Sequence, residues 1–131
     1  AANTLDDYEE GVVDTENLTF STSGTATTQA NYRELRYTKV GSAVTLTGNI
    51  FIGSVSSQNG FLKIPLPFAN GTGEKNRTAG SVANLQSNTP TLLKVDSGQS
   101  FAGLITSSGF ATVTVSANHT YVINLCYNTD A

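Results

Sequence analysis

Val44-Thr45-Leu46-Thr47-Gly48-Asn49-Ile50-Phe51-Ile52 is the stretch of sequence that decides the fold. Its residues alternate between a face of aliphatic side chains and glycine and a face of hydroxyl, amide and aromatic groups. Successive side chains of a β-strand point to opposite sides, so the pattern predicts a strand with one buried face. The members of that buried face are Val44, Leu46, Gly48, Ile50 and Ile52.

The segment before this strand is predicted to be its antiparallel neighbour. Residues 32–40 reach it through Gly41-Ser42, a two-residue link in which glycine supplies the positive φ of a tight hairpin. On the other side, Ser56-Ser57-Gln58-Asn59-Gly60 is typical of a turn. The strand expected at residues 61–64 must end at Pro65-Leu66-Pro67 because proline donates no hydrogen bond to a ladder. That strand is therefore expected to be short or to lie at an edge.

Further strands are predicted in the second half of the chain, separated by turns rich in Gly, Ser, Asn and Asp. The links Asp96-Ser97-Gly98-Gln99 and Ser107-Ser108-Gly109 are short, which favours a meander of neighbouring strands. The chain is thus predicted to be all-β, one antiparallel β-sandwich of the jelly-roll kind with about eight or nine strands and no helix of two turns. The strands of this half are expected at residues 79–86, 91–95, 100–105, 110–115 and 120–127.

Length and charge restrict the classes of partner. The chain has 131 residues, which suits one domain with one core. Its net charge is −3, and its seven Lys and Arg residues are scattered rather than gathered in a stripe, which argues against nucleic acid as a partner. No apolar run approaches the roughly 18 residues of a membrane span, so membrane insertion is not expected.

An acidic segment precedes the predicted sheet. Residues 3–17 contain no basic residue, and like charges extend a chain. Residues 1–17 are therefore predicted to be an acidic connector to an upstream fibre or β-helix, with the sandwich domain at 18–131. Because the chain contains no methionine, it is expected to be a fragment of a longer protein. The carboxylates of the segment are Asp6, Asp7, Glu9, Glu10, Asp14 and Glu16.

The sequence gives little support for a catalytic site. A Ser-His-Asp triad would have to use the single histidine, His119, with Asp96 or Asp130. However, the chain has no Gly-x-Ser-x-Gly elbow, and His119 is predicted to lie in a turn. The acidic segment could supply a hydrolase carboxylate pair or calcium ligands, but a solvated connector is the preferred interpretation. The stretch Gly71-Thr72-Gly73 lacks the third glycine of a nucleotide fingerprint. We expect no enzyme activity, no metal and no cofactor.

Cys126 is the only cysteine, so the chain can form no internal disulfide. It lies between Leu125 and Tyr127 in an apolar run. It is therefore expected to be a small core residue without a function of its own.

Two sets of side chains are candidates for binding carbohydrate. A sugar site usually has an aromatic ring that contacts the C–H groups of the sugar, and charged or amide side chains that bind its hydroxyls. These side chains are usually held on loops. Tyr32, Arg33 and Arg36 form one set. The other set is Asn70, Glu74, Lys75 and Arg77, in the polar, glycine-rich loop that is expected to be exposed. The alternative for both sets is ordinary surface or core residues.

Several stretches resemble the C-terminal domains of bacteriophage tail fibres and tailspikes. Leu5-Asp6-Asp7-Tyr8-Glu9-Glu10-Gly11 is similar to the junction from which such domains begin. Arg36-Tyr37-Thr38-Lys39-Val40-Gly41 comes next, followed by the alternating strand from Val44. Ile64-Pro65-Leu66-Pro67-Phe68 is similar to the Leu-Pro-Phe that closes the next strand in the family. After Gly11 the family usually continues with Thr, an aromatic residue and Pro, and this chain departs from that pattern.

The resemblance implies a homotrimeric, non-catalytic domain at the distal end of a fibre on the virion, attached to the upstream part of the same fibre. Such domains commonly recognise polysaccharide on the host cell surface. The first hypothesis is therefore receptor binding by a trimer whose avidity compensates for weak single sites. A second is a trimer-stabilising folding cap that makes no receptor contact. A third is a pilin or adhesin module completed by a neighbour's strand.

Overall fold

The computed structural model describes residues 8–87, 91–106 and 113–130. The described residues form antiparallel strands and one short 3-10 turn, η2 (Glu74–Asn76), which confirms the prediction of an all-β, antiparallel fold. The strands are β1 (Tyr8–Asp14), β2 (Asn17–Phe20), β3 (Ser23–Thr28), β4 (Glu34–Val40), β5 (Ala43–Asn59), β6 (Leu62–Pro65), β7 (Thr78–Asn84), β8 (Thr91–Val95), β9 (Phe101–Thr106) and β10 (Thr120–Asn128).

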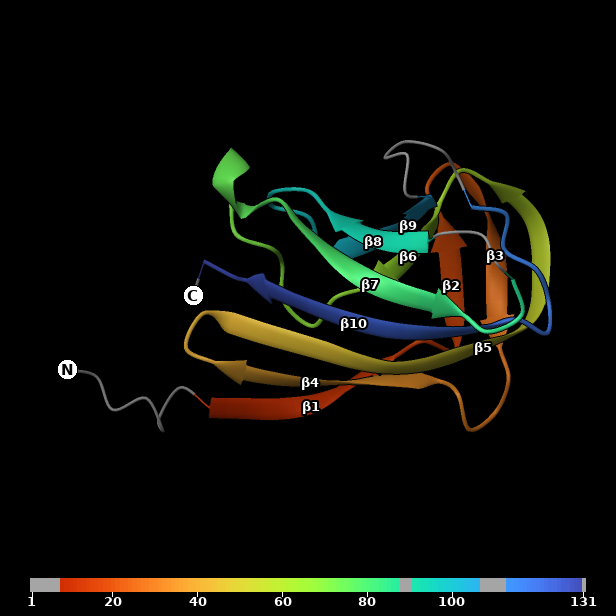
Figure 1. Ribbon diagram of the computed structural model, residues 1–131, viewed down its shortest axis with the longest axis horizontal. Helices are drawn as coiled ribbons and strands as arrows, with labels where there is room; N and C mark the ends of the chain where they lie inside the picture. Colours follow the sequence, from red (N-terminus) through yellow and green to blue (C-terminus); the bar gives the residue numbers. More distant parts are fainter. Residues whose placement is uncertain (1–7, 88–90, 107–112, 131) are drawn as a thin grey trace.

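The strands pair into one continuous sheet in the order β1-β4-β5-β10-β7-β8-β9-β6-β2-β3. This order closes on itself because β5 pairs with β10 along its first part and with β3 along its second part. In Figure 1, β7, β10, β5, β4 and β1 lie side by side, while β2 and β3 run across them at one end of the molecule. The pairing therefore does not divide the strands into two separate sheets.

The length of β5 is the reason for this continuity. Residues 56–60 were predicted to be a turn, and that prediction is wrong because the strand continues through them to Asn59. Ser57 has a positive φ of 56°, and the register with β3 shifts between Ser23 and Thr25, so the irregularity is absorbed as a bulge. The predicted hairpin before β5 is confirmed, since Gly41 has a φ of 59° and Val40 pairs with Ala43.

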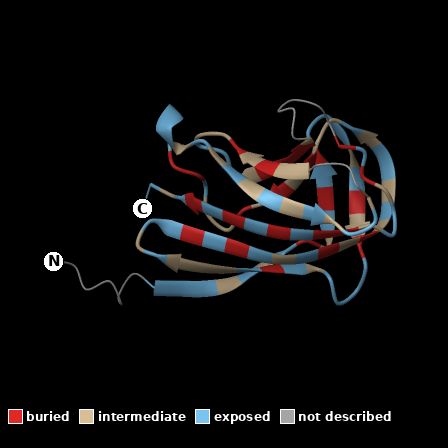
Figure 2. Cartoon of the chain, in the orientation of Figure 1, coloured by how far each residue is buried: buried red, intermediate tan, exposed pale blue. Residues whose placement is uncertain are grey.

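The core lies on the inner side of this closed sheet. Buried and exposed residues alternate along β5 and β10, as the bands of colour in Figure 2 show. Leu46 and Ile50 of β5 pack in the same core as Leu125 and Tyr127 of β10, and each is at most 2% exposed. The alternation read from residues 44–52 thus correctly predicted the buried face.

The first described residue, Tyr8, already belongs to a strand, so the prediction that residues up to 17 form a connector is wrong for the described part of that segment. β1 pairs with β4 along its whole length, from Tyr8 opposite Val40 to Asp14 opposite Glu34. Glu9 lies opposite Lys39 and accepts a hydrogen bond from the Tyr37 hydroxyl at 3.0 Å. The basic and phenolic partners on β4 offset the charge that favoured a linker. Residues 1–7, with Asp6 and Asp7, lie outside the described residues.

The other predicted strands are found with small shifts, except residues 110–115. Residues 110–112 lie outside the described part, and 113–115 form no strand. Val113 and Val115 are nevertheless buried, and the Gln58 side chain supplies the backbone hydrogen bonds that a strand partner would make. Its Nε2 donates to the Val113 carbonyl at 2.9 Å, and its Oε1 accepts from the Val115 amide at 2.9 Å. β6 ends at Pro65 as predicted, but it is no edge strand, since it pairs with both β9 and β2.

The buried side chain of Tyr127 holds the segment after β6 in place, and its ionisation is expected to make the stability of the fold depend on pH. Tyr127 donates its hydroxyl proton to the Phe68 carbonyl at 2.7 Å, and burial raises its pKa from 10.0 to about 12. The neutral phenol therefore contributes stability that is complete below pH 10 and is lost as the pH rises through about 12.

We expect the stability advantage of the natural protein over Tyr127→Phe to shrink between pH 10 and about 12, because only the natural protein has this phenol to ionise. Urea unfolding of both proteins at a series of pH values measures the advantage. An advantage that stays constant across this range would contradict the prediction.

Candidate functional site

The first predicted set is only partly assembled. Tyr32 and Arg36 line one shallow hollow, which we call the Tyr32 hollow, and the Tyr32 ring centroid lies 5.6 Å from that of Phe51. Arg33 is used elsewhere, since its guanidinium pairs with Glu16 at 3.0 Å and its Nε donates to the Thr28 carbonyl at 3.2 Å. The remaining residues of the Tyr32 hollow are Asn31, Glu34, Thr47, Gly48 and Asn49.

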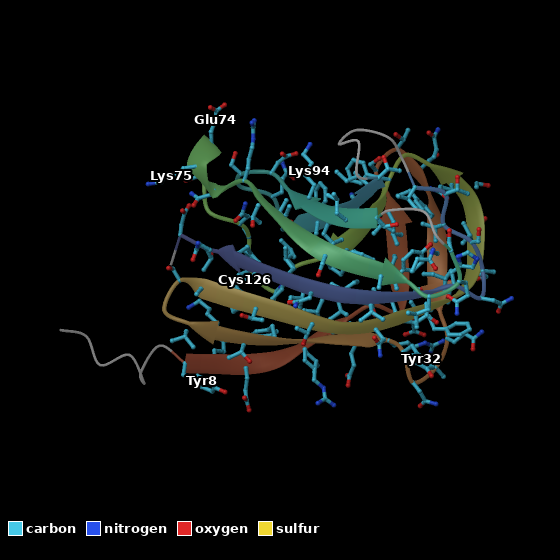
Figure 3. All side chains as sticks on the ribbon, viewed as in Figure 1. Tyr8, Tyr32, Glu74, Lys75, Lys94 and Cys126 are labelled. Atoms are coloured by element: carbon cyan, nitrogen blue, oxygen red, sulfur yellow. The ribbon has the colours of Figure 1, made fainter. Side chains whose placement is uncertain are left out.

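The second predicted set lies in a loop that side-chain hydrogen bonds hold in place. Asn70 was expected on an exposed loop, but it is 2% exposed, and its amide donates to the carbonyls of Asn76 at 2.5 Å and Asp96 at 3.1 Å. Glu74 and Lys75 are exposed on η2, and Arg77 lies 3.8 Å from a carboxylate oxygen of Asp96. Figure 3 shows Glu74 and Lys75 at the opposite end of the molecule from Tyr32, so the two sets do not form one site.

The residues considered for a catalytic triad, His119 with Asp96 or Asp130, have separate partners in the structure. The His119 ring nitrogen Nδ1 lies 3.2 Å from the Asn84 amide nitrogen. Asp96 pairs with Lys94 at 3.4 Å, and Asp130 accepts hydrogen bonds from the Thr72 backbone amide and hydroxyl. Within residues 8–87, 91–106 and 113–130, no group of three or more His, Cys, Asp or Glu side chains is placed to hold a metal ion. Nor does this part of the chain include a helix with the length and apolar character to cross a membrane.

A groove that the sequence did not predict lies on the outer face of β9 and β8, next to Phe61, the residue before β6. We call it the Phe101 groove. Its volume is about 200 Å³, and the rings of Phe61 and Phe101 stack within it, with centroids 6.2 Å apart and planes at 27°. Gly103 makes room for Phe61, because a Cβ at that position would stand 3.0 Å from the Phe61 ring. The residues that line the groove are Phe61, Lys94, Asp96, Gln99, Phe101, Gly103 and Ile105.

A second hollow adjoins the groove on the β2 side, and Phe101 lines both. The Lys63 side chain lies at this boundary, with its Nζ 4.9 Å from the Phe101 ring centroid. Lys63 is opposite Gly103 on β9 and opposite Thr19 on β2, so the strand pairing fixes its position. The lining of this second hollow is completed by Asn17, Leu18, Thr19, Pro65 and Ser100.

The groove therefore combines apolar ring surface with charged and amide groups. Lys94 and Asp96 form an ion pair at one end, Gln99 adds an amide, and Lys63 stands beside Phe101. An aromatic face can contact the C–H side of a pyranose while the polar groups bind its hydroxyls. This is the chemistry expected of a shallow carbohydrate site, and here it is assembled in one place.

A second exposed feature is an outer face without charge. The cross-strand register places outward residues of β7, β10 and β5 side by side, and we call this surface the neutral face. Val122 on this face is 37% exposed, whereas the same side of β4 and β1 carries exposed Val40, Val12 and Tyr8 together with the charged Arg36 and Glu10. The neutral face consists of Ala79, Ser81, Ala83, Val122, Asn124, Cys126, Asn128, Ala43, Thr45, Thr47 and Asn49, all of them exposed.

Cys126 lies in the middle of the neutral face (Figure 3), so the expectation that it is a core residue is wrong. Its neighbours Leu125 and Tyr127 point inward and are at most 2% exposed. Alternation along a strand then requires the residue between them to point outward.

The sequence could not reveal the groove because both faces of β9 are apolar. Phe101, Gly103 and Ile105 share the outer face, while Ala102 and Leu104 share the inner one, and a run of this kind gives no sign of which face is exposed.

Comparison with protein-family models, with curated proteins and with solved structures finds no match.

Proposed function

We propose that the chain is a non-catalytic receptor-binding domain, the distal domain of a bacteriophage tail fibre or tailspike, that forms a homotrimer and binds glycan on the host cell surface. The single observation that carries the binding role is the Phe101 groove, in which two stacked rings share the lining with Lys94 and Asp96 and in which Lys63 lies over one of the rings. The virion setting rests on the resemblance of the first half of the sequence to that family.

The shape of the groove is consistent with a weak, repeated interaction. A volume of about 200 Å³ accommodates only a small part of a polysaccharide chain. When several identical sites are joined in one oligomer, the second binding event becomes intramolecular, and total affinity rises by about 10²- to 10⁴-fold without new contacts. A shallow groove is therefore sufficient for attachment if the domain is oligomeric.

The neutral face supports oligomerisation. Protein interfaces are depleted of charged residues at their centre, and closed homo-oligomers bury self-complementary or matching patches of their subunits. Within the described residues, the outer faces of β7, β10 and β5 carry no charged side chain, whereas the whole chain has a net charge of −3. This face alone would also serve the second candidate function, a trimer-stabilising cap without receptor contact.

Binding and mass measured together distinguish the two functions. The 131-residue chain is applied to an array of bacterial surface polysaccharides, and its mass is measured by light scattering. A receptor-binding trimer gives three times the mass of 13.7 kDa and binds part of the array. A trimer that binds no polysaccharide favours the cap, and a monomer that binds none contradicts both.

A further inference from the structure

We propose that the Phe101 groove recognises an acidic sugar, a hexuronic acid or a similar carboxylate-bearing residue, with Lys63 contacting the carboxylate. The inference rests on the proposed function, because it assumes that the groove binds glycan. It adds the chemical class of the ligand and the residue that selects it.

Lys63 is held in place for such a contact. Its Nζ lies 4.9 Å from the centroid of Phe101, the ring shared by the groove and the adjoining hollow. A sugar bound against the exposed part of Phe101 would therefore meet this ammonium group, which lies over the ring. The pairing of β6 with β9 and β2 fixes the lysine backbone on both sides, so the charge is presented from a rigid strand rather than from a loop.

Among the described residues, no carboxylate pairs with Lys63, unlike the other cations near the groove. Lys94 pairs with Asp96 at 3.4 Å, and Arg77 lies 3.8 Å from Asp96 and 3.8 Å from Glu74. None of the ion pairs in the described part of the chain includes Lys63. The charges of Lys94 and Asp96 in the groove lining cancel, so Lys63 of the adjoining hollow adds one positive charge beside the groove, although the whole chain has a net charge of −3.

A carboxylate is the ligand group that this arrangement favours most. A carboxylate bound at Lys63 would form a charge-assisted hydrogen bond that a hydroxyl cannot match. A neutral sugar would make the same ring contact and would use Lys63 only as a hydroxyl donor. Selection for acidic sugars is thus a difference in affinity caused by one side chain.

The experiment compares each acidic polysaccharide with its own neutral form. Hexuronate-containing polysaccharides are tested before and after chemical reduction of their carboxyl groups to primary alcohols, which retains the linkages. We expect the natural protein to bind the unreduced form about tenfold more tightly. Lys63→Gln should bind both forms equally, at the level of the reduced form, and should have an unchanged melting temperature.

Lys39→Gln is the matched control, because the Lys39 Nζ also lies over an aromatic ring, 5.5 Å from the centroid of Phe68, but away from the groove. It should keep the full preference for the unreduced form. A preference that survives in Lys63→Gln, or that is absent in the natural protein while neutral polysaccharides bind, overturns the acidic-sugar inference alone. Failure to bind any polysaccharide, acidic or neutral, overturns the proposed function with it.

Discussion

Replacing Phe101 by Ala is expected to weaken glycan binding about 30-fold, a loss of about 2 kcal/mol, which is typical of an aromatic residue at the centre of a binding site. Phe101 lines both the groove and the adjoining hollow, so its removal takes away the surface that the two share. Titration calorimetry with a polysaccharide that the natural protein binds measures the effect. The variant should still unfold cooperatively, because the Phe101 side chain points away from the core.

Tyr32→Ala is the matched control for this result. Tyr32 is 40% exposed and lines the Tyr32 hollow, which contains part of one of the two candidate sets offered by the sequence. We expect its replacement to change affinity less than twofold, on the order of the small effects seen outside the centre of a binding site. A large loss in Tyr32→Ala together with normal binding by Phe101→Ala would place the site in the Tyr32 hollow and contradict the assignment to the groove.

Introducing a lysine into the neutral face is expected to abolish the trimer. Asn124 lies on β10 between Thr47 of β5 and Ser81 of β7, and all three side chains are exposed in the single chain. In a symmetric oligomer Asn124→Lys adds one positive charge per copy to the same interface, and burying unpaired like charges costs several kcal/mol. The mass measured by light scattering should fall from three times 13.7 kDa to 13.7 kDa.

Ser56→Lys provides the control, because Ser56 is exposed on the second part of β5, where the strand pairs with β3. This variant should remain a trimer. The exposed thiol of Cys126 gives an independent measurement, since a maleimide should label it slowly in the trimer and rapidly in Asn124→Lys. Equal labelling rates and an unchanged mass in Asn124→Lys would show that the neutral face is not the subunit contact.

The parts of the fold that follow from local patterns could be predicted from the sequence. The aliphatic alternation of residues 44–52 identified the buried face of β5, and Gly41 marked the hairpin that precedes it. Proline ended β6 where expected. In each case the deciding property is local. It is either the two-residue alternation of side chains along a strand or the backbone preference of a single residue.

The failures involve pairing between residues far apart in the chain. The acidic composition of β1 favoured a linker, but Lys39 on β4 lies opposite Glu9 and offsets its charge. The polar residues 56–60 are typical of a turn, but pairing with β3 keeps them in a strand. The Phe101 groove is formed by Phe61, by β8 and the segment after it, and by β9, and the local sequence gives no signal that these parts come together. Cys126 is different, because the inward neighbours Leu125 and Tyr127 already implied an outward position.

The most direct test of the account is a crystal structure of the chain with a bound oligosaccharide from a polysaccharide that it recognises. We predict a sugar ring packed against Phe101, with Asp96 or Lys94 bound to its hydroxyls and Lys63 beside a carboxylate where the sugar has one. An oligosaccharide bound away from β6, β8 and β9 would contradict the account.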